Sequence, residues 1–275
     1  SACADADAGY YVPSSGQSSQ TACVVGTYQS STGQSSCDDA DAGYYVSGTA
    51  QTSQTACAAG TYNPSTGSSS SSACADADAG YYVPSSGQSS QTACAAGTFS
   101  SATGSPSCTD ALPGYFVPVQ GQTSATECLI GYYQSASGQT SCDIADIGYY
   151  VDQTGQSSQT QCPTSTTTIA TGSTSSLQCL SDHDGDQTVD ALDVDDDNDG
   201  VDDINDLCPN GQSMLSSDND GDGCDDSTED ADDDNDGVLD GDDDLPLDST
   251  ESLDTDGDGT GNNADTDDDG DSVLD

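Results

Sequence analysis

Eleven cysteines recur at regular intervals over the first 179 residues of the chain. Successive cysteines lie 20, 14, 20, 17, 20, 14, 20, 14, 20 and 17 residues apart, which defines five repeats of 34 or 37 residues. The segment ADADAGYYVPSSGQSSQTAC occurs unchanged at 4–23 and at 75–94. We therefore expect residues 1–179 to form an array of five small stacked units rather than one globular domain.

Large apolar side chains are too few to build an ordinary core. The 275 residues are 31% hydrophobic, with no Trp, one Met and two Phe, against about 45–50% apolar residues in a typical soluble domain. Burial alone cannot offset the conformational entropy of such a chain. Cross-links or bound ions have to replace the core.

Single, regularly spaced cysteines without a Cys-x-x-Cys pair indicate disulfides formed in an oxidising compartment. Two pairing registers are open. The first closes the shorter loops and leaves Cys3 over, and its pairs are Cys23–Cys37, Cys57–Cys74, Cys94–Cys108, Cys128–Cys142 and Cys162–Cys179. The second closes the longer loops, from Cys3–Cys23 to Cys142–Cys162, and leaves Cys179 over. We prefer the first, which leaves Cys208 and Cys224 to pair with each other.

Each half of a repeat places a glycine before one or two aromatic residues, then a Ser/Thr/Gly/Gln turn and a cysteine. A glycine such as Gly26 or Gly43 permits an unusual backbone angle, and the Ser-Gly-Gln stretch turns the chain back. We expect a short β-hairpin or an irregular loop. The run from Cys23 through Val-Val-Gly-Thr-Tyr to Thr-Gly-Gln-Ser-Ser-Cys37 resembles the cysteine-rich repeats of ephrin-receptor and tumour-necrosis-receptor type. This resemblance covers residues 1–179, although each junction has one cysteine where that family often has two.

The composition changes near Cys179–Leu180, where we place a domain boundary between 1–179 and 180–275. Of the 50 acidic residues, 38 follow this boundary. They recur as D-x-D-x-D followed by acids at the ninth and twelfth positions. Six loops result, and the predicted metal ligands of the first three are Asp182, Asp184, Asp186, Asp190, Asp193; Asp195, Asp197, Asp199, Asp203, Asp206; and Asp218, Asp220, Asp222, Asp226, Glu229. Those of the last three are Asp232, Asp234, Asp236, Asp240, Asp243; Asp254, Asp256, Asp258, Asn262, Asp265; and Asp267, Asp269, Asp271, Asp275.

Oxygen ligands at alternating positions are typical of a calcium site, because Ca²⁺ takes about 6–8 oxygens in a flexible cage. Mg²⁺ prefers tighter octahedral sites and is the weaker candidate, and the lack of thiolate and imidazole ligands disfavours zinc and copper. A disordered acidic tail would not explain the 36-residue period of the loops that start at 182, 218 and 254. EF-hands are excluded because no room is left for flanking helices.

The segment DDDNDGVDDINDLCPN at 195–210 resembles thrombospondin type 3 repeats. This resemblance covers residues 182–275. It implies a chain with little regular secondary structure that winds around calcium ions, with disulfides linking successive repeats. The predicted fold class is thus irregular: an elongated array of small disulfide-stapled β-hairpins followed by calcium-wrapped loops.

Several functions are disfavoured by what the chain lacks. It has no Lys and no Arg, whereas binding to nucleic acid and to anionic lipid depends on these residues. No stretch is long and apolar enough for direct membrane insertion. No catalytic constellation is recognisable, and the one histidine, His183, occupies a non-ligand position. We therefore do not expect an enzyme.

The sequence favours an extracellular or cell-surface structural protein, such as a stalk, fibre or surface filament. Its expected partners are calcium ions and copies of itself. The alternative is a spacer in a calcium-dependent cell-surface adhesin or receptor ectodomain. Because the sequence opens and closes inside repeat patterns, we expect the chain to continue at both ends.

Overall fold

The computed structural model describes residues 5–212 and 215–274. Within these ranges the regular structure consists of two short 3-10 turns and ten two-stranded antiparallel hairpins. The hairpins pair β1 (Tyr10–Tyr11) with β2 (Thr21–Ala22), β3 (Thr27–Tyr28) with β4 (Asp38–Asp39), β5 (Tyr44–Tyr45) with β6 (Thr55–Ala56), β7 (Thr61–Tyr62) with β8 (Ala75–Asp76), β9 (Tyr81–Tyr82) with β10 (Thr92–Ala93), β11 (Thr98–Phe99) with β12 (Thr109–Asp110), β13 (Tyr115–Phe116) with β14 (Thr126–Glu127), β15 (Tyr132–Tyr133) with β16 (Asp143–Ile144), β17 (Tyr149–Tyr150) with β18 (Thr160–Gln161), and β19 (Thr166–Thr168) with β20 (Cys179–Ser181).

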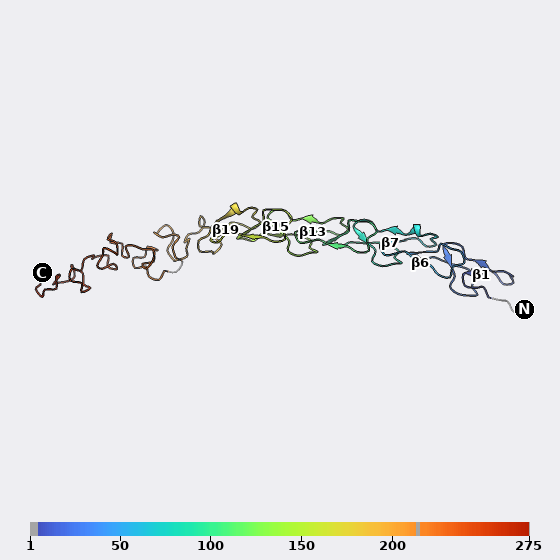
Figure 1. The fold of residues 1–275 in the computed structure, drawn as a ribbon, viewed down its shortest axis with the longest axis horizontal. Helices are drawn as coiled ribbons and strands as arrows, with labels where there is room; N and C mark the ends of the chain where they lie inside the picture. The colour runs from blue at the N-terminus through green and yellow to red at the C-terminus, as the bar shows by residue number, and fades with distance from the viewer. Residues whose placement is uncertain (1–4, 213–214, 275) are drawn as a thin grey trace. The chain divides into compact units, whose positions relative to one another are not determined.

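The chain divides into two compact units. The first holds the chain up to Ile144 together with Gln153–Gln159, and the second holds Ala145–Asp152 together with the chain from Thr160 onward. The first unit therefore contains the hairpins from β1 to β16, which follow one another in chain order (Figure 1). The division lies inside the hairpin array, whereas the change from hairpins to loops follows β20, next to the boundary expected at 179–180.

The predicted array is confirmed: up to β20 the described chain consists of small disulfide-stapled hairpins with little other regular structure. Each repeat contains two hairpins, one in each half. Of the two local forms expected, a short β-hairpin or an irregular loop, the structure has the hairpin. The described residues form six disulfides, which are the pairs of the first register together with Cys208–Cys224. Cys3 lies outside the described residues.

Backbone hydrogen bonds join each hairpin of the first unit to the next. Gly26 N–H donates to the Val46 carbonyl at 2.8 Å, and Gln29 N–H donates to the Gln51 carbonyl at 3.0 Å. In the opposite direction, Ala50 N–H donates to the Cys23 carbonyl at 2.8 Å. Because an isolated hairpin is at best marginally stable in water, this ladder of main-chain bonds supplies stability that the hairpins lack individually.

In most hairpins, the glycine before the first strand makes a still closer approach. Gly97 has a φ of +87°, and a Cβ added there would lie 2.1 Å from the carbonyl oxygen of Gly138, in the hairpin two further along. Gly60 meets Gly104 in the same way, at 2.2 Å. Only glycine combines this φ with room for the neighbouring backbone. The residue in this place in the last hairpin is Ser165, which has a φ of 56°.

Small side chains form the buried column of the array. The residue three positions before each glycine is buried and alternates between alanine and cysteine, as in Ala40, Cys57, Ala77 and Cys94. The residue three positions after it alternates between valine and a polar residue. The buried polar residues are hydrogen-bonded: the Asn63 side-chain nitrogen donates to the Tyr44 carbonyl at 2.9 Å, and its oxygen accepts from Ser65 N–H at 3.1 Å.

Disulfides occur in alternate hairpins, and a hydrogen-bonded Asp–Gln pair takes their place in three of the others. In the hairpin β5–β6, Gln54 Oε1 accepts from Asp41 N–H at 2.7 Å, and Gln54 Nε2 donates to Asp41 Oδ2 at 2.6 Å. The same double contact joins Asp7 to Gln20 and Asp78 to Gln91. These clamps account for aspartates of the array that the sequence left unassigned.

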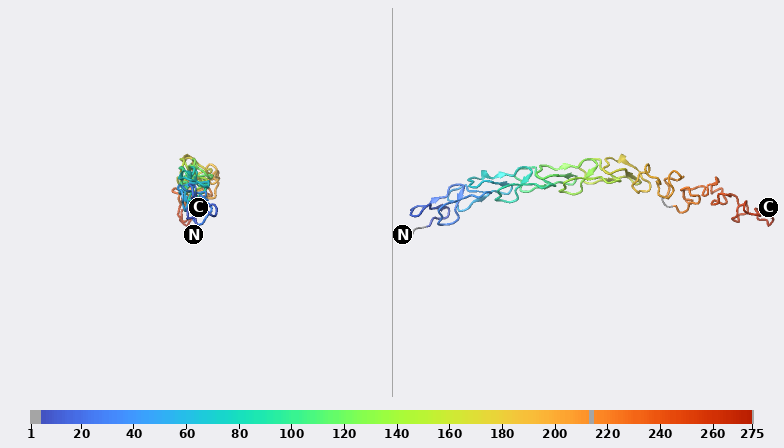
Figure 2. Two further views of the ribbon diagram at one scale, coloured as in Figure 1. Left: turned by 90° about the vertical axis from the view of Figure 1, so that its right-hand side faces the viewer. Right: turned by 180° about the vertical axis from the view of Figure 1, so that it is seen from behind.

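From Asp182 onward the described chain follows irregular loops without strands, in the orange-to-red part of Figure 2. Among the described residues, no helix has the length and apolar character needed to cross a membrane.

The glycine contact predicts unequal effects of one substitution at two sites with the same φ. Gly97→Ala and Gly16→Ala both place a Cβ at φ +87°, but a Cβ at Gly16 meets nothing within 4 Å. We expect Gly16→Ala to cost about 1–2 kcal/mol from the backbone angle. Gly97→Ala should cost a further 1–3 kcal/mol or so because two backbones must separate. Hydrogen exchange of the flanking hairpins measures both, and equal losses would contradict the close approach.

Candidate metal centre

The first three predicted ligands of each of loops one to four converge in space. In each group, three carboxylate oxygens lie within 4.8 Å of one another. The four groups are Asp182, Asp184 and Asp186; Asp195, Asp197 and Asp199; Asp218, Asp220 and Asp222; and Asp232, Asp234 and Asp236. The structure therefore brings together the residues at positions one, three and five that the sequence selected.

Hydrogen bonds between side chains and backbone give the loops their curl. In loop four, Asp234 Oδ1 accepts from Asp236 N–H at 3.0 Å, Asp236 Oδ1 accepts from Val238 N–H at 2.7 Å, and Asp240 Oδ1 accepts from Asp233 N–H at 2.9 Å. The backbone thus holds one oxygen of each of these carboxylates, and Asp234 Oδ2 has no hydrogen-bond partner among the described residues.

The other predicted ligands make equivalent bonds. The ninth residue accepts from the second N–H of its loop at Asp190, Asp203, Asp226 and Asn262. Asn262 thus takes the same place as the acids. Asp254, Asp256 and Asp258 in loop five, and Asp267, Asp269 and Asp271 in loop six, also accept backbone N–H groups. Asp275 lies outside the described residues.

Several buried carboxylate oxygens in these loops accept no hydrogen bond from the described residues. They include Asp234 Oδ2 and Asp243 Oδ2, whose residues are 4% and 8% exposed. Others among the predicted ligands are Asp195 Oδ1, Asp199 Oδ2, Asp232 Oδ1 and Asp267 Oδ1. An unpaired buried carboxylate is costly, and the chain has no Lys or Arg to pair with it. The arrangement suits an external cation.

Burial also shifts the titration of these carboxyl groups. Removal from water raises the pKa of Asp206 to about 6, with further contributions from the neighbouring Asp199 and Asp197. Burial raises the pKa of Asp182, Asp197 and Asp234 as well. Burial and neighbouring carboxylates thus disfavour the charged forms of these groups.

Asp225 shows how a structural aspartate of the same segment differs. It is 2% exposed, and hydrogen bonds from Ser227 and Ser216 lower the pKa of its carboxyl group. Its oxygens are satisfied by these donors, so no ion is needed to explain its burial.

Loop three closes differently from the sequence-based assignment. Asp193 and Asp265 follow a turn and accept backbone N–H groups from the next two residues, and the equivalent residue in loop three is Asp230. The predicted ligand Glu229 instead accepts from Gln212 N–H at 3.3 Å. The turn after Asp225 is wider by one residue, because Asp230 N–H also bonds to the Asp225 carbonyl.

Asp230 belongs to a group that the sequence analysis did not include. Oxygens of Asp226, Asp230 and Asp233 lie within 4.8 Å of one another, and Asp230 Oδ2 and Asp233 Oδ1 are buried without a partner. Burial and the nearby Asp240 raise the pKa of Asp233 to about 6. One feature of the sequence could have revealed this group. Loops two and four carry an additional acidic residue at their second position, Asp196 and Asp233.

Loops two and three are joined covalently and by backbone. The disulfide Cys208–Cys224 links them, and Leu207 N–H donates to the Asp222 carbonyl at 2.9 Å. Asp206 is held beside this junction, where its Oδ1 accepts from Cys208 N–H at 2.6 Å. His183 is exposed, as its non-ligand position predicts.

Comparison of the sequence with models of known protein families and with curated proteins found no match.

The raised pKa of Asp206 predicts a pH dependence of the metal-free protein. Its folded-state pKa of about 6 exceeds the ordinary 3.8, so folding favours the protonated form. The contribution of Asp206 to stability is therefore fully present below about pH 4 and is lost as the pH rises through about 6, by on the order of 2–3 kcal/mol. In chelator, Asp206→Asn should remove this loss, whereas the exposed control Asp202→Asn should keep it.

Hydrogen exchange of peptides covering 195–224, compared between variants at matched pH, measures the effect. Equal protection of Asp206→Asn and Asp202→Asn at every pH would show that Asp206 is not buried in the metal-free protein.

Proposed function

We propose that this protein is an extracellular structural element, a stalk, fibre or surface filament, whose aspartate-rich segment folds around calcium ions. The disulfides indicate a secreted or extracellular protein, because such cross-links persist in oxidising compartments. A cell-surface location and a structural rather than enzymatic role are parts of the proposal.

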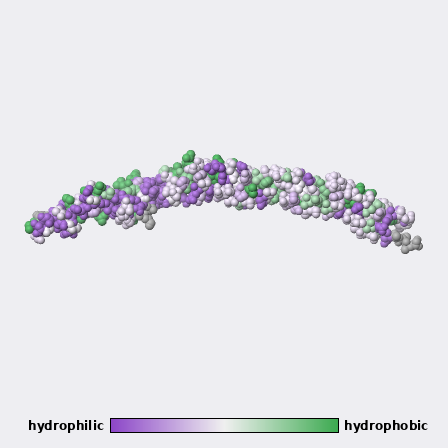
Figure 3. Space-filling model, viewed as in Figure 1, coloured by the Kyte–Doolittle hydropathy of each residue, from purple (hydrophilic) through white to green (hydrophobic). Residues whose placement is uncertain are grey.

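One observation carries the calcium assignment. Carboxylates converge in successive loops with buried oxygens that have no donor, in a chain without Lys or Arg. On the surface of this segment, hydrophilic residues alternate with exposed aliphatic ones (Figure 3). Ile204, for example, is 90% exposed. The aspartate-rich segment has little buried apolar surface that could offset the repulsion between its carboxylates. Bound divalent ions would cancel charge and supply the missing contacts, so that binding energy becomes folding energy.

Calcium suits the donor set better than magnesium. Each loop offers oxygens only, from several carboxylates and from nearby carbonyl groups, and Ca²⁺ accepts such a variable shell. Asp182, Asp195, Asp218 and Asp232 each begin a loop with the same spacing, so one chemistry repeats along the segment. The resemblance of 195–210 to thrombospondin type 3 repeats supports the same choice.

The hairpin array supports the structural role. Each hairpin of the first unit is bonded to its neighbour through the main chain, and a staple or clamp closes most hairpins individually. Such nearest-neighbour contacts allow a chain to be extended by adding repeats without a common core. A spacer requires this property, because its length is set by the number of repeats.

The proposal predicts that Asp234→Asn weakens calcium binding more than Asp242→Asn. Asp234 is buried and has an unpartnered oxygen, whereas Asp242 is exposed and lies outside the predicted ligands. Both substitutions remove one negative charge, so the two variants have the same net charge. Calorimetric titration with CaCl₂ should show affinity lost at the fourth loop in Asp234→Asn, by roughly tenfold or more, and wild-type behaviour in Asp242→Asn.

A parallel titration with MgCl₂ tests the choice of ion. Binding of Mg²⁺ with equal affinity and heat would contradict calcium selectivity. Failure of chelator to change the hydrogen exchange of residues 182–274 would overturn the proposed role of bound ions in folding.

A further inference from the structure

We propose that the surface of the hairpin β15–β16 is a contact site for a second copy of this chain. This inference adds a surface to the proposed structural role. It concerns the first unit and does not involve the aspartate loops, so it can fail or succeed independently of calcium.

The surface differs from the equivalent surfaces of the other disulfide-bonded hairpins. Tyr132 stands where Thr27, Thr61 and Thr98 stand in those hairpins. Leu129 replaces Val24, Ala58 and Ala95, and Ile144 replaces Asp39, Asp76 and Asp110. Three positions that are polar, acidic or smaller elsewhere have thus become large and apolar in one hairpin.

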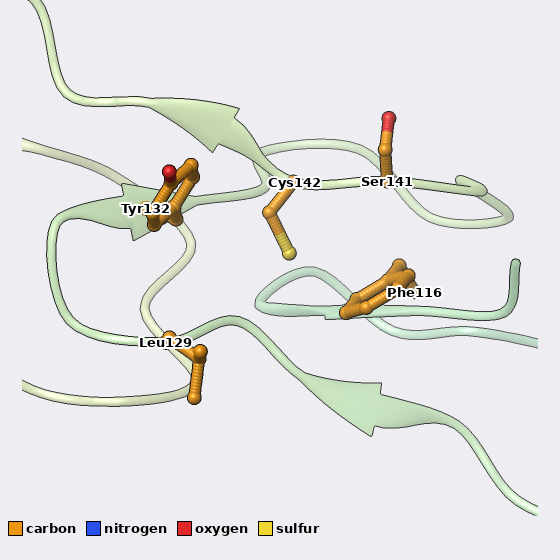
Figure 4. Close-up of a pocket in the computed structure, with 5 residues that line it drawn as sticks. All are labelled: Phe116, Leu129, Tyr132, Ser141 and Cys142. Carbon is orange, nitrogen blue, oxygen red and sulfur yellow. The ribbon is translucent and has the colours of Figure 1, made fainter. Parts of the chain in front are cut away.

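Two of these residues, Leu129 and Tyr132, line a hollow. A cavity of about 230 Å³ is lined by Phe116, Leu129, Tyr132, Ser141 and Cys142, and Figure 4 shows their side chains around it. Tyr132 and Ile144 are directly opposite each other on β15 and β16, so their side chains share one face. We call Phe116, Leu129, Tyr132, Cys142 and Ile144 the apolar patch.

The apolar patch contains a hollow, and it also contains exposed side chains that could enter the hollow of a second copy. Leu129 is 67% exposed and Ile144 is 42% exposed. A two-fold related copy could place an aliphatic side chain of one patch in the hollow of the other, since such an interface uses the same surface twice. Exposed apolar clusters on an otherwise polar protein mark interaction sites.

Charge favours a second copy as the partner. Two chains of net charge −50 repel each other except where acids are sparse. Between Asp110 and Asp143 the only acidic residue is Glu127, which accepts hydrogen bonds from the Tyr115 and Thr154 hydroxyl groups. A basic partner would be attracted to the aspartate loops instead. The patch is also much smaller than the interfaces of stable dimers, so the association is weak and strengthens when salt screens the flanking charge.

Sedimentation equilibrium of the full chain tests this contact, with Leu129→Asp and the matched control Val24→Asp. Val24 holds the equivalent position in the hairpin β3–β4 and is 61% exposed, so both variants add one charge at an exposed site. Wild-type protein should self-associate more tightly at about 0.5 M than at about 0.1 M NaCl. Leu129→Asp should raise the dissociation constant about tenfold or more, and Val24→Asp should change it by about twofold or less. Tyr132→Thr, which restores the residue of the other hairpins, should also weaken association.

A wild-type chain that stays monomeric at high concentration and salt would overturn the proposal, as would equal effects of Leu129→Asp and Val24→Asp. Self-association that disappears in chelator would also overturn it, because it would place the contact in the metal-dependent segment. Correct folding of each variant is checked by hydrogen exchange of the hairpins β15–β16 and β3–β4.

Discussion

Main-chain hydrogen bonds between successive hairpins carry the stability of the first unit, and they depend on how closely two backbones can approach. Glycines such as Gly60 and Gly97 permit that approach, because their missing Cβ atoms leave room for a carbonyl oxygen of the hairpin two further along. A column of alanine, cysteine and valine then fills the narrow space inside. Small side chains are therefore a requirement of the architecture, and the low apolar content of the chain is its consequence.

The aspartate loops also have few apolar contacts, and hydrogen bonds between polar groups replace them. Backbone N–H groups hold one oxygen of many carboxylates, and other oxygens stay buried without donors. Asp225, whose oxygens are fully engaged by serine donors, shows that the segment can satisfy a carboxylate internally where it is required. The unsatisfied oxygens of loops such as the fourth therefore point to a ligand from outside the chain.

Repetition also makes local departures informative. Ser165 replaces a glycine in the last hairpin of the array, where no hairpin follows two places further along. Tyr132, Leu129 and Ile144 replace smaller or polar residues in a single hairpin and create an apolar patch. Such an array tolerates these changes, because the exposed surface of one hairpin can vary without affecting the buried column. This is how an interaction site can be added to a structural repeat.

The sequence by itself determined the repeat lengths and the loop positions of the aspartates, because both are a matter of spacing along the chain. Spacing left two disulfide registers open, and the structure decided between them. Only the tertiary structure decided which atoms meet across repeats. It identified the glycine contacts, the Asp–Gln clamps such as Asp41–Gln54, and the turn at which Asp230 rather than Glu229 accepts the next two backbone N–H groups. The turn after Asp225 is one residue wider than in the other loops, and the spacing of acidic residues along the sequence does not reveal this. It arises from backbone hydrogen bonds, which every residue can form and which therefore leave little trace in the choice of side chains.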